Sequence, residues 1–343
     1  MIQPSHFHTD VLIIGAGIAG LMAANVCLRQ RRRVILVDKG RAVGGRLATR
    51  RIGPGRADHG AQFFTVREDA FAAWVHRWQR QGLAYTWAHG WSHGSLHPSH
   101  ADGQPRYAVH EGMNTLAKHL AADLQEAGVA IHTGVQITAL RPRDDGWQAQ
   151  SADGVTFSAR GLLLTPPPPQ SLALLAAGQT TLAPADQDAL ARIAYSTCLC
   201  GLFWIEGAFD LPEPGALQLP GQTIAWIADN QRKGISPAAC LITAQAGPEF
   251  SRDHWHREDG EVLALMQASL RGFFDPGTRV RESQLKRWRY SLPLTTHPQR
   301  FLAAQGLPPL LFAGDAFDGP RIEGAALSGL AAAAHLGAIL SPA

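Results

Sequence analysis

The hydrophobic pattern near the start of the chain predicts a strand, a glycine-rich turn, a helix and a second strand. The apolar run from Val11 to Ile14 leads into residues 15–20, which carry three glycines. Helix-compatible residues follow from Leu21 to Gln30, and a second apolar run, 34–37, ends at Asp38. This order is typical of the βαβ unit that binds a dinucleotide.

Each conspicuous position in this unit has a physical role. Gly15 permits the tight turn, Gly17 lets the backbone approach a pyrophosphate, and Gly20 lets the helix pack closely on the strand. The start of the helix offers backbone N–H groups and a positive dipole end to phosphate groups. Asp38, at the end of the second strand, is expected to accept hydrogen bonds from a ribose.

Periodicity predicts further elements along the chain. Aromatic residues at helical spacing between Arg67 and Leu83 indicate a packing helix, and a second helix is expected after Asn114. The buried strand 161–165 must leave its sheet at the prolines 166–169. The remaining predicted elements are strands at 129–140, Tyr195–Ile205, Thr223–Ala228, Cys240–Ala246, Leu285–Tyr290 and Leu310–Asp315, and a helix from Gly324 to about Leu340.

Composition and charge narrow the classes of protein. A chain of 343 residues with 45% hydrophobic and 17% charged residues is typical of a globular enzyme of about two domains. The formal net charge of +3 is too small to indicate a nucleic-acid partner. The apolar stretch from Val11 to Leu28 is near the length of a membrane span, but its glycine spacing favours the βαβ unit. We therefore expect a cytoplasmic protein without a membrane partner.

Two groups of side chains leave alternatives open. Cys198 and Cys200 are two residues apart in an apolar run, so they could form a redox pair or simply pack in a core. The four cysteines form no disulfide framework. Glycine and proline interrupt any helix that would align the histidines of residues 89–100, so no metal site is expected. These histidines are His89, His93, His97 and His100.

A second glycine-rich turn follows Asp38. Gly44 and Gly45 with Arg46 suit a cofactor whose pyrophosphate and sugar chain continue past the first helix, as in FAD. A dehydrogenase that binds only a nicotinamide cofactor has no need of this turn. The segment 57–65 brings small residues and then Phe63 and Phe64, which is the composition expected where backbone passes close to a flavin ring.

The order of these motifs resembles that of the FAD-dependent amine oxidase superfamily and, within it, the renalase-like enzymes. The resemblance spans nearly the whole chain. It is carried by residues 15–20, Asp38-Lys39 with Gly44-Gly45-Arg46, Gly60-Ala61-Gln62-Phe63, Thr165-Pro166, Tyr195-Ser196 with Gly201-Leu202-Phe203, Asp229-Asn230, Gly314-Asp315 and Glu323-Gly324-Ala325.

The resemblance implies an α/β fold, with a Rossmann-like FAD-binding domain of the amine oxidase type and an inserted α+β substrate domain. Residues 9–66, 108–168 and 300–341 would form the FAD-binding domain, and residues 67–107 and 169–299 the substrate domain. The helix near Gly324 would direct its positive end at the flavin. The expected cofactor-binding residues are Gly15, Gly17, Ile18, Ala19, Gly20, Asp38, Lys39, Arg41, Gly45, Arg46, Gly60, Ala61, Gln62, Val135, Gly314, Asp315, Gly324 and Ala325.

Two departures from the family pattern refine these expectations. Residues 323–326 contain no cysteine, so FAD should be held noncovalently. Where amine oxidases place an aromatic pair against the flavin, residues 317–321 supply Pro320 and Arg321, which favours a polar or anionic substrate.

The resemblance implies an oxidase that takes a hydride from 2- or 6-dihydro isomers of NAD(P) and passes the electrons to dioxygen, giving hydrogen peroxide. An amine oxidase, with Lys233 or Lys286 as the partner of a water molecule near the flavin, is the alternative enzyme. A flavin-binding redox sensor that uses the two cysteines is the alternative without turnover. The candidate residues on the substrate side are Phe63, Phe64, Asn230, Thr243, Trp288 and Arg321.

Overall fold

The structure, a computed structural model, describes residues 6–93 and 103–340. The chain divides into two compact units, and each is assembled from separate segments of the sequence. Unit 1 comprises residues 1–45, 117–194 and 293–343, and unit 2 comprises residues 46–116 and 195–292. The two units are described separately below.

Unit 1 contains an eight-stranded sheet in the order β17-β18-β11-β1-β2-β8, in which β10 pairs with β11 and with β9. The strands from β18 to β8 run parallel, so their carboxyl ends lie at one edge of the sheet. Ligands of open α/β sheets bind at this edge. The strands are β1 (His6–Ile14), β2 (Val34–Asp38), β8 (Ala130–Thr133), β9 (Ile137–Arg143), β10 (Gly146–Ser151), β11 (Thr156–Leu164), β17 (Leu302–Ala303) and β18 (Leu310–Phe312).

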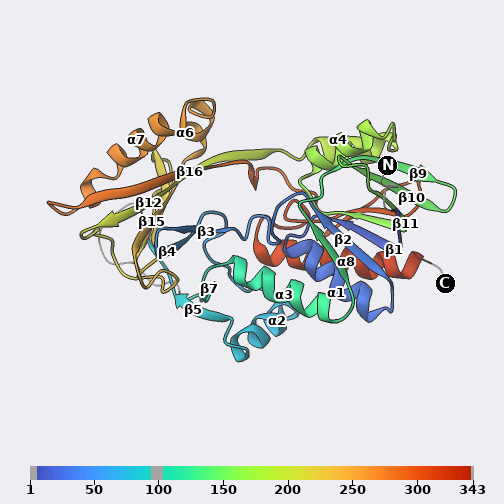
Figure 1. Cartoon of the computed structure of the whole chain (residues 1–343), viewed down its shortest axis with the longest axis horizontal. Coiled ribbons are helices and arrows are strands. Elements are labelled where there is room, and N and C mark those ends of the chain that lie inside the picture. The colour runs from blue at the N-terminus through green and yellow to red at the C-terminus, as the bar shows by residue number, and fades with distance from the viewer. Residues whose placement is uncertain (1–5, 94–102, 341–343) are drawn as a thin grey trace. The chain divides into compact units, whose positions relative to one another are not determined.

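Helices α1 (Ile18–Arg29) and α8 (Ile322–Ile339) pack against each other beside this sheet (Figure 1). A Cβ atom on Gly329 of α8 would lie 2.1 Å from the carbonyl oxygen of Ala19, so the two helix backbones are in contact at this glycine. The other helices of unit 1 are α4 (Pro168–Ala177) and α5 (Pro184–Ala191), and the division between the units falls within α3 (Asn114–Glu126).

Helix α8 is long and apolar enough to cross a membrane by length and composition alone. Half of it is buried inside the structure, however, and the core helix of a globular protein can have the same length and apolar composition. The apolar stretch 11–28 is divided among β1, the first glycine turn and α1, as the βαβ interpretation predicts.

Unit 2 contains a six-stranded sheet in the order β16-β12-β15-β14-β13-β6 and two separate two-stranded antiparallel sheets, β3-β4 and β5-β7. Its strands are β3 (Thr49–Ile52), β4 (Gly55–Asp58), β5 (Ala84–Ala88), β6 (Ser92–His93), β7 (Arg106–Val109), β12 (Tyr195–Glu206), β13 (Ala216–Gln218), β14 (Ile224–Asp229), β15 (Cys240–Ala246) and β16 (Arg279–Pro293). Its helices are α2 (Asp69–Arg80), α6 (Pro248–Asp253), α7 (Asp259–Ser269) and the short 3-10 helix Arg271–Phe273. Leu199, Phe203 and Ile242 of the sheet and Met266 of α7 lie in one buried apolar cluster.

The predicted elements are largely confirmed, and the strand 285–290 proves to be the middle of the longer strand β16. The units, however, divide the chain differently from the predicted domains. Residues 46–66 and 108–116 belong to unit 2, since β4 packs on β15 of the six-stranded sheet. Residues 169–194 belong to unit 1, since α4 packs on β9.

Candidate functional site

The first glycine turn follows β1 at the carboxyl edge of the unit 1 sheet. Gly15 has a positive φ of 102°, which is the left-handed region that favours glycine. The Thr165 hydroxyl, just past β11, lies 2.9 Å from the Ile14 carbonyl oxygen and 3.0 Å from that of Gly15. A Cβ atom on Gly20 would lie 1.9 Å from the Gly15 carbonyl oxygen, so α1 packs as closely as the glycine spacing predicts.

The second glycine turn lies beside the first. The Gly44 amide donates to the Ala16 carbonyl oxygen at 2.8 Å, and a Cβ atom on Gly45 would lie 3.6 Å from the Gly17 Cα. A Cβ atom on Gly17 would meet no described atom within 4 Å, and no described side chain caps α1 at this residue. Open backbone at a helix N-terminus, next to residues Ile18 and Ala19 of the first turn, fits a pyrophosphate.

Asp38 joins the two turns. One carboxylate oxygen accepts a hydrogen bond from the Ala16 amide and the other from the Gly40 amide, both at 2.6 Å. Each oxygen has a second lone pair, so these bonds leave capacity for a ribose hydroxyl. The Val135 amide donates to the Asp38 carbonyl oxygen at 3.0 Å. Lys39 donates to the Gln170 side chain, and Arg41 is exposed.

The loop after β18 contacts the N-terminal half of α8. The Gly314 amide donates to the Ser328 hydroxyl at 2.8 Å, and Asp315 follows directly. A Cβ atom on Gly324 would lie 2.4 Å from the Gly319 carbonyl oxygen. Arg321 is the exposed N-cap residue of α8, and its carbonyl oxygen accepts from the Ala325 amide.

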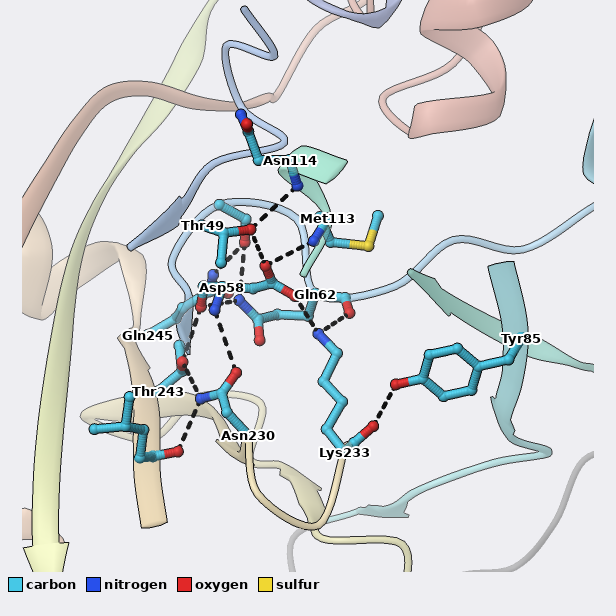
Figure 2. A network of polar contacts seen from close by, with 12 residues as sticks. Thr49, Asp58, Gln62, Tyr85, Met113, Asn114, Asn230, Lys233, Thr243 and Gln245 are labelled. Atoms are coloured by element: carbon cyan, nitrogen blue, oxygen red, sulfur yellow. Dashed lines mark hydrogen bonds and ion pairs between the residues drawn. The ribbon is translucent and has the colours of Figure 1, made fainter. Parts of the chain in front are cut away.

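In unit 2, side chains donate hydrogen bonds to the carbonyl groups of four of the residues 58–62 (Figure 2). A Cβ atom on Gly60 would lie 2.0 Å from the Arg46 carbonyl oxygen, which also accepts from the Ala61 amide at 2.8 Å. The donors to the four held carbonyls are Gln62 Nε2 and Thr243 Oγ1 to Asp58 (2.8 Å each), Trp288 Nε1 to His59 (2.8 Å), Gln245 Nε2 (2.8 Å) and Gln62 Nε2 (3.1 Å) to Gly60, and Lys233 Nζ to Gln62 (2.5 Å).

An ion pair lies at the centre of this network. Lys233 Nζ is 2.7 Å from Asp58 Oδ2, and both side chains are fully buried. Asp58 Oδ1 accepts hydrogen bonds from the Thr49 hydroxyl at 2.5 Å and from the Met113 amide at 2.8 Å (Figure 2). Burial lowers the pKa of Lys233, and the neighbouring Asp58 carboxylate opposes that shift.

Asn230 and Thr243, predicted on the substrate side, are fully buried beneath this segment. The Asn230 side chain accepts from the Asp58 amide at 3.2 Å and donates to Thr243 Oγ1 at 2.9 Å. Their partners are therefore protein groups, and neither presents a surface that a substrate could reach. Arg46 donates to the Tyr290 carbonyl oxygen at 3.3 Å.

The predicted aromatic residues have different surroundings. Phe63 is half-buried, and its ring centroid lies 4.8 Å from that of Trp91 and 5.6 Å from that of Trp226. Phe64 is 3% exposed and packs against α2 and β7, so it is a core residue. Trp288 is half-buried and stacks on the imidazole of His59 with 5.3 Å between ring centroids.

Two buried polar atoms on either side of Gly60 and Ala61 have no partner among the described residues. They are His59 Nδ1 and Gln62 Oε1. Burial, with smaller effects from Lys286 and Arg50, lowers the pKa of His59 to about 4, so its imidazole is neutral at pH 7. Because buried polar groups normally have partners, these two atoms fit a bound ring system with donors and acceptors on its edge. A flavin is such a ring system.

The cysteines are poorly placed for redox chemistry. Cys198 and Cys200 are buried, and burial raises the pKa of Cys198 to about 12 and that of Cys200 well above its usual range. Because the thiolate is the reactive form, burial disfavours the reaction of both thiols. Residues 6–93 and 103–340 contain no group of three or more His, Cys, Asp or Glu side chains that could hold a metal. His97 and His100 lie outside the described residues.

Comparison with known proteins identifies the family. The family model of flavin containing amine oxidoreductases matches residues 72–337. The chain belongs to this family. A model of the NAD(P)-binding Rossmann-like domain also matches residues 13–80, which contain the first glycine turn. The chain is therefore a flavin-dependent oxidoreductase, and the predicted fold class is confirmed.

Relatives support this assignment over nearly the full chain. Mouse renalase (Mus musculus) is 22% identical over an alignment of 333 residues that covers 93% of this chain and 96% of renalase. A structure of putrescine oxidase with bound putrescine has a TM-score of 0.74 at 15% identity and covers 97% of this chain and 100% of its own. A putative protoporphyrinogen oxidase from Exiguobacterium sp. 255-15 has a TM-score of 0.73 at 14% identity, with 98% and 100% covered. The chain is a renalase-like flavoprotein of the amine oxidase superfamily.

Sequence reasoning about this flavoprotein missed several residues that hold the site together. It considered Lys233 only as a partner of a water molecule, and it gave no role to Thr49 or Ser328. A local signal existed for Asp58, because a lone carboxylate stands among small residues just before Gly60. Its partner lies 175 residues further along the chain, so no local pattern connects the two.

Proposed function

We propose that this flavoprotein is an oxidase that binds FAD noncovalently, takes a hydride from 2- or 6-dihydro isomers of NAD(P) and reduces dioxygen to hydrogen peroxide. The observation that carries the proposal is the similarity to renalase over 93% of the chain. The overall reaction balances when one dihydronicotinamide, one proton and one dioxygen give one NAD(P)⁺ and one hydrogen peroxide.

FAD, rather than a flavin mononucleotide, is supported by the paired glycine turns of unit 1. Gly17 leaves open backbone at the N-terminus of α1, and Gly44 and Gly45 extend that surface past the first turn. Asp38 is in place to accept hydrogen bonds from the adenosine ribose. These groups suit a pyrophosphate between two sugar chains.

Noncovalent binding is supported by residues 323–326, which contain no cysteine for a flavin thioether. The purified protein is expected to be yellow and to release the whole chromophore into the supernatant when it is precipitated with acid. The supernatant spectrum and its chromatographic comparison with FAD provide the measurement. Chromophore retained in the washed pellet would contradict this part of the proposal.

The residues of the chain have positioning roles in this reaction. The flavin, when bound, supplies the acceptor for the hydride. In unit 1, the positive end of α8 can stabilise negative charge on the bound group. In unit 2, segment 58–64 presents the ring of Phe63, and Trp288 stacks beside it on His59. Hydride transfer from an electron-rich ring needs orientation and exclusion of water more than it needs an acid or base.

Amine oxidation is the second candidate, favoured by the family assignment and by the likeness to putrescine oxidase. Lys286 is half-buried, and its pKa is lowered by burial and by Arg50, so it could assist a neutral amine. Lys233 is less suited, since its ammonium group is bonded to Asp58 and Gln62. The burial of Cys198 and Cys200, which raises the pKa of both thiols, weighs against a redox sensor.

Anaerobic titration of the flavin spectrum separates the two enzymes. Addition of 2- or 6-dihydro-NAD(P) is expected to bleach the flavin absorbance within the mixing time of a manual titration. Simple amines such as putrescine should leave it unchanged over the same period. Readmission of air should restore the spectrum with one hydrogen peroxide per substrate oxidised. Bleaching by amines alone would overturn the leading proposal and favour the second.

A further inference from the structure

We propose that the buried Lys233–Asp58 ion pair is a positioning device that fixes segment 58–64 in the conformation in which it meets the flavin. The inference rests on the proposed function only in taking this segment as the part of unit 2 that faces the cofactor. Lys233 and Asp58 would be positioning residues, because each acts through the backbone that it holds (Figure 2).

The backbone polar groups of segment 58–64 are of two kinds. Those bonded to protein groups form the held side of the segment, and those without a partner among the described residues form its open side. The carbonyls of Asp58, His59, Gly60 and Gln62 accept from side chains elsewhere in unit 2 or in the segment itself. The amides of residues 58–61 and of Phe64 are bonded as well. Among the described residues, the amides of Gln62 and Phe63 have no partner. These two adjacent donors are left for a ligand, together with Gln62 Oε1 and His59 Nδ1.

Lys233 sets the conformation at the boundary between the two sides. It donates to the carbonyl oxygen of Gln62 at 2.5 Å, and this peptide group carries the amide of Phe63 at its other end. Because a peptide group is planar, holding the carbonyl fixes the direction of the following N–H. The bond from Lys233 therefore directs the Phe63 amide away from Lys233 and towards the open side.

The ammonium group is itself held in place. Its second hydrogen bond goes to Asp58 at 2.7 Å, and it lies 5.0 Å from the centre of the Trp87 ring, which is cation–π distance. At the other end of the residue, the Tyr85 hydroxyl donates to the Lys233 carbonyl oxygen. Both ends of the lysine are fixed, so little freedom remains for the group that holds Gln62.

Stability alone does not account for this pair. Two apolar side chains of similar volume usually support a fold as well as a buried ion pair does, because burying two charges costs nearly as much as their attraction returns. An apolar pair cannot, however, donate a hydrogen bond to the Gln62 carbonyl. The donor is the property that the lysine adds, and the aspartate keeps that donor charged and aimed.

The test compares Lys233→Met with the double variant Asp58→Asn/Lys233→Met. Lys233→Met removes the donor and leaves a buried carboxylate without its cation, so we expect both lower thermal stability and faster exchange of the segment. The double variant removes the unpaired charge and should recover most of the stability. Hydrogen exchange of residues 58–64 in the apoprotein should nevertheless stay at least tenfold faster than in the wild type, because Gln62 still lacks its donor.

The holoprotein supplies a second readout. Both variants should shift the visible absorption maxima of the bound flavin and lower kcat at least tenfold, with a smaller change in KM. Arg281→Met is the matched control, because it breaks an exposed ion pair with Glu206 in the same unit and should change none of these quantities. A double variant with wild-type exchange and a wild-type flavin spectrum would overturn the inference and leave the pair a purely structural element. If Lys233→Met does not fold, the comparison of the double variant with the wild type tests the inference by itself.

Exchange in the apoprotein needs neither flavin nor substrate. A protein that failed to oxidise dihydronicotinamides would contradict the proposed function and leave the exchange comparison valid. Wild-type exchange in the double variant would contradict the positioning inference whatever the substrate proves to be.

Discussion

A Gly17→Ala variant is expected to purify without flavin, while its apoprotein unfolds at the same temperature as the wild-type apoprotein. Gly17 has ordinary φ and ψ angles, and its Cβ position is open, so alanine fits the folded chain. The added methyl group would occupy the space through which a pyrophosphate reaches the backbone. We expect at least 100-fold weaker flavin binding, or about 3 kcal/mol, measured by titrating apoprotein with FAD.

Gly260→Ala is the matched control for this experiment. Gly260 lies in α7 and also has an open Cβ position, so the same methyl group is added where no cofactor is proposed. Its flavin affinity should equal that of the wild type. A Gly17→Ala protein that retained full affinity would show that the cofactor lies elsewhere than on the first glycine turn.

The second large effect is a loss of stability in mild acid that depends on His59. Burial lowers the pKa of this histidine to about 4 from an ordinary value of 6.5. Below pH 6.5 the unfolded chain binds a proton at this residue and the folded chain does not, so the free energy of unfolding falls until about pH 4. This histidine should account for a loss of about 3 kcal/mol over that range.

His59→Phe isolates the contribution, since phenylalanine keeps a ring to stack on Trp288 and cannot be protonated. Urea unfolding of the two apoproteins at intervals between pH 7 and pH 4 is the measurement. The variant should lose less stability than the wild type, and the difference should grow steadily below pH 6.5. Parallel curves would mean that the His59 imidazole becomes protonated in the folded protein as easily as in the unfolded chain.

The parts of the site that the sequence predicted are those built from consecutive residues. The turn that begins at Gly15, the close packing at Gly20 and the acid at Asp38 each follow from a local rule about backbone geometry or strand order. The parallel core of unit 1 followed for the same reason, since its strands are short apolar runs bounded by turns.

The parts that were not predicted depend on pairs distant in the sequence. Asn230 and Thr243 have polar side chains at the end of a strand or within one, which is also where substrate-binding residues stand. Only their contacts with Asp58 show that they support a backbone segment. The two compact units divide the chain differently from the predicted domains for a similar reason, because β4 follows the first segment of unit 1 in sequence but packs on β15 of unit 2.

The discontinuity of unit 1 has a consequence for the order in which the protein matures. Every residue of unit 2 is translated before β18 and α8 are. The parallel sheet lacks its β18 neighbour, and α1 lacks its partner helix, until that last stretch emerges, which takes on the order of seconds. Unit 2 is therefore complete in sequence while unit 1 still lacks one strand of its parallel sheet and the helix that packs on α1.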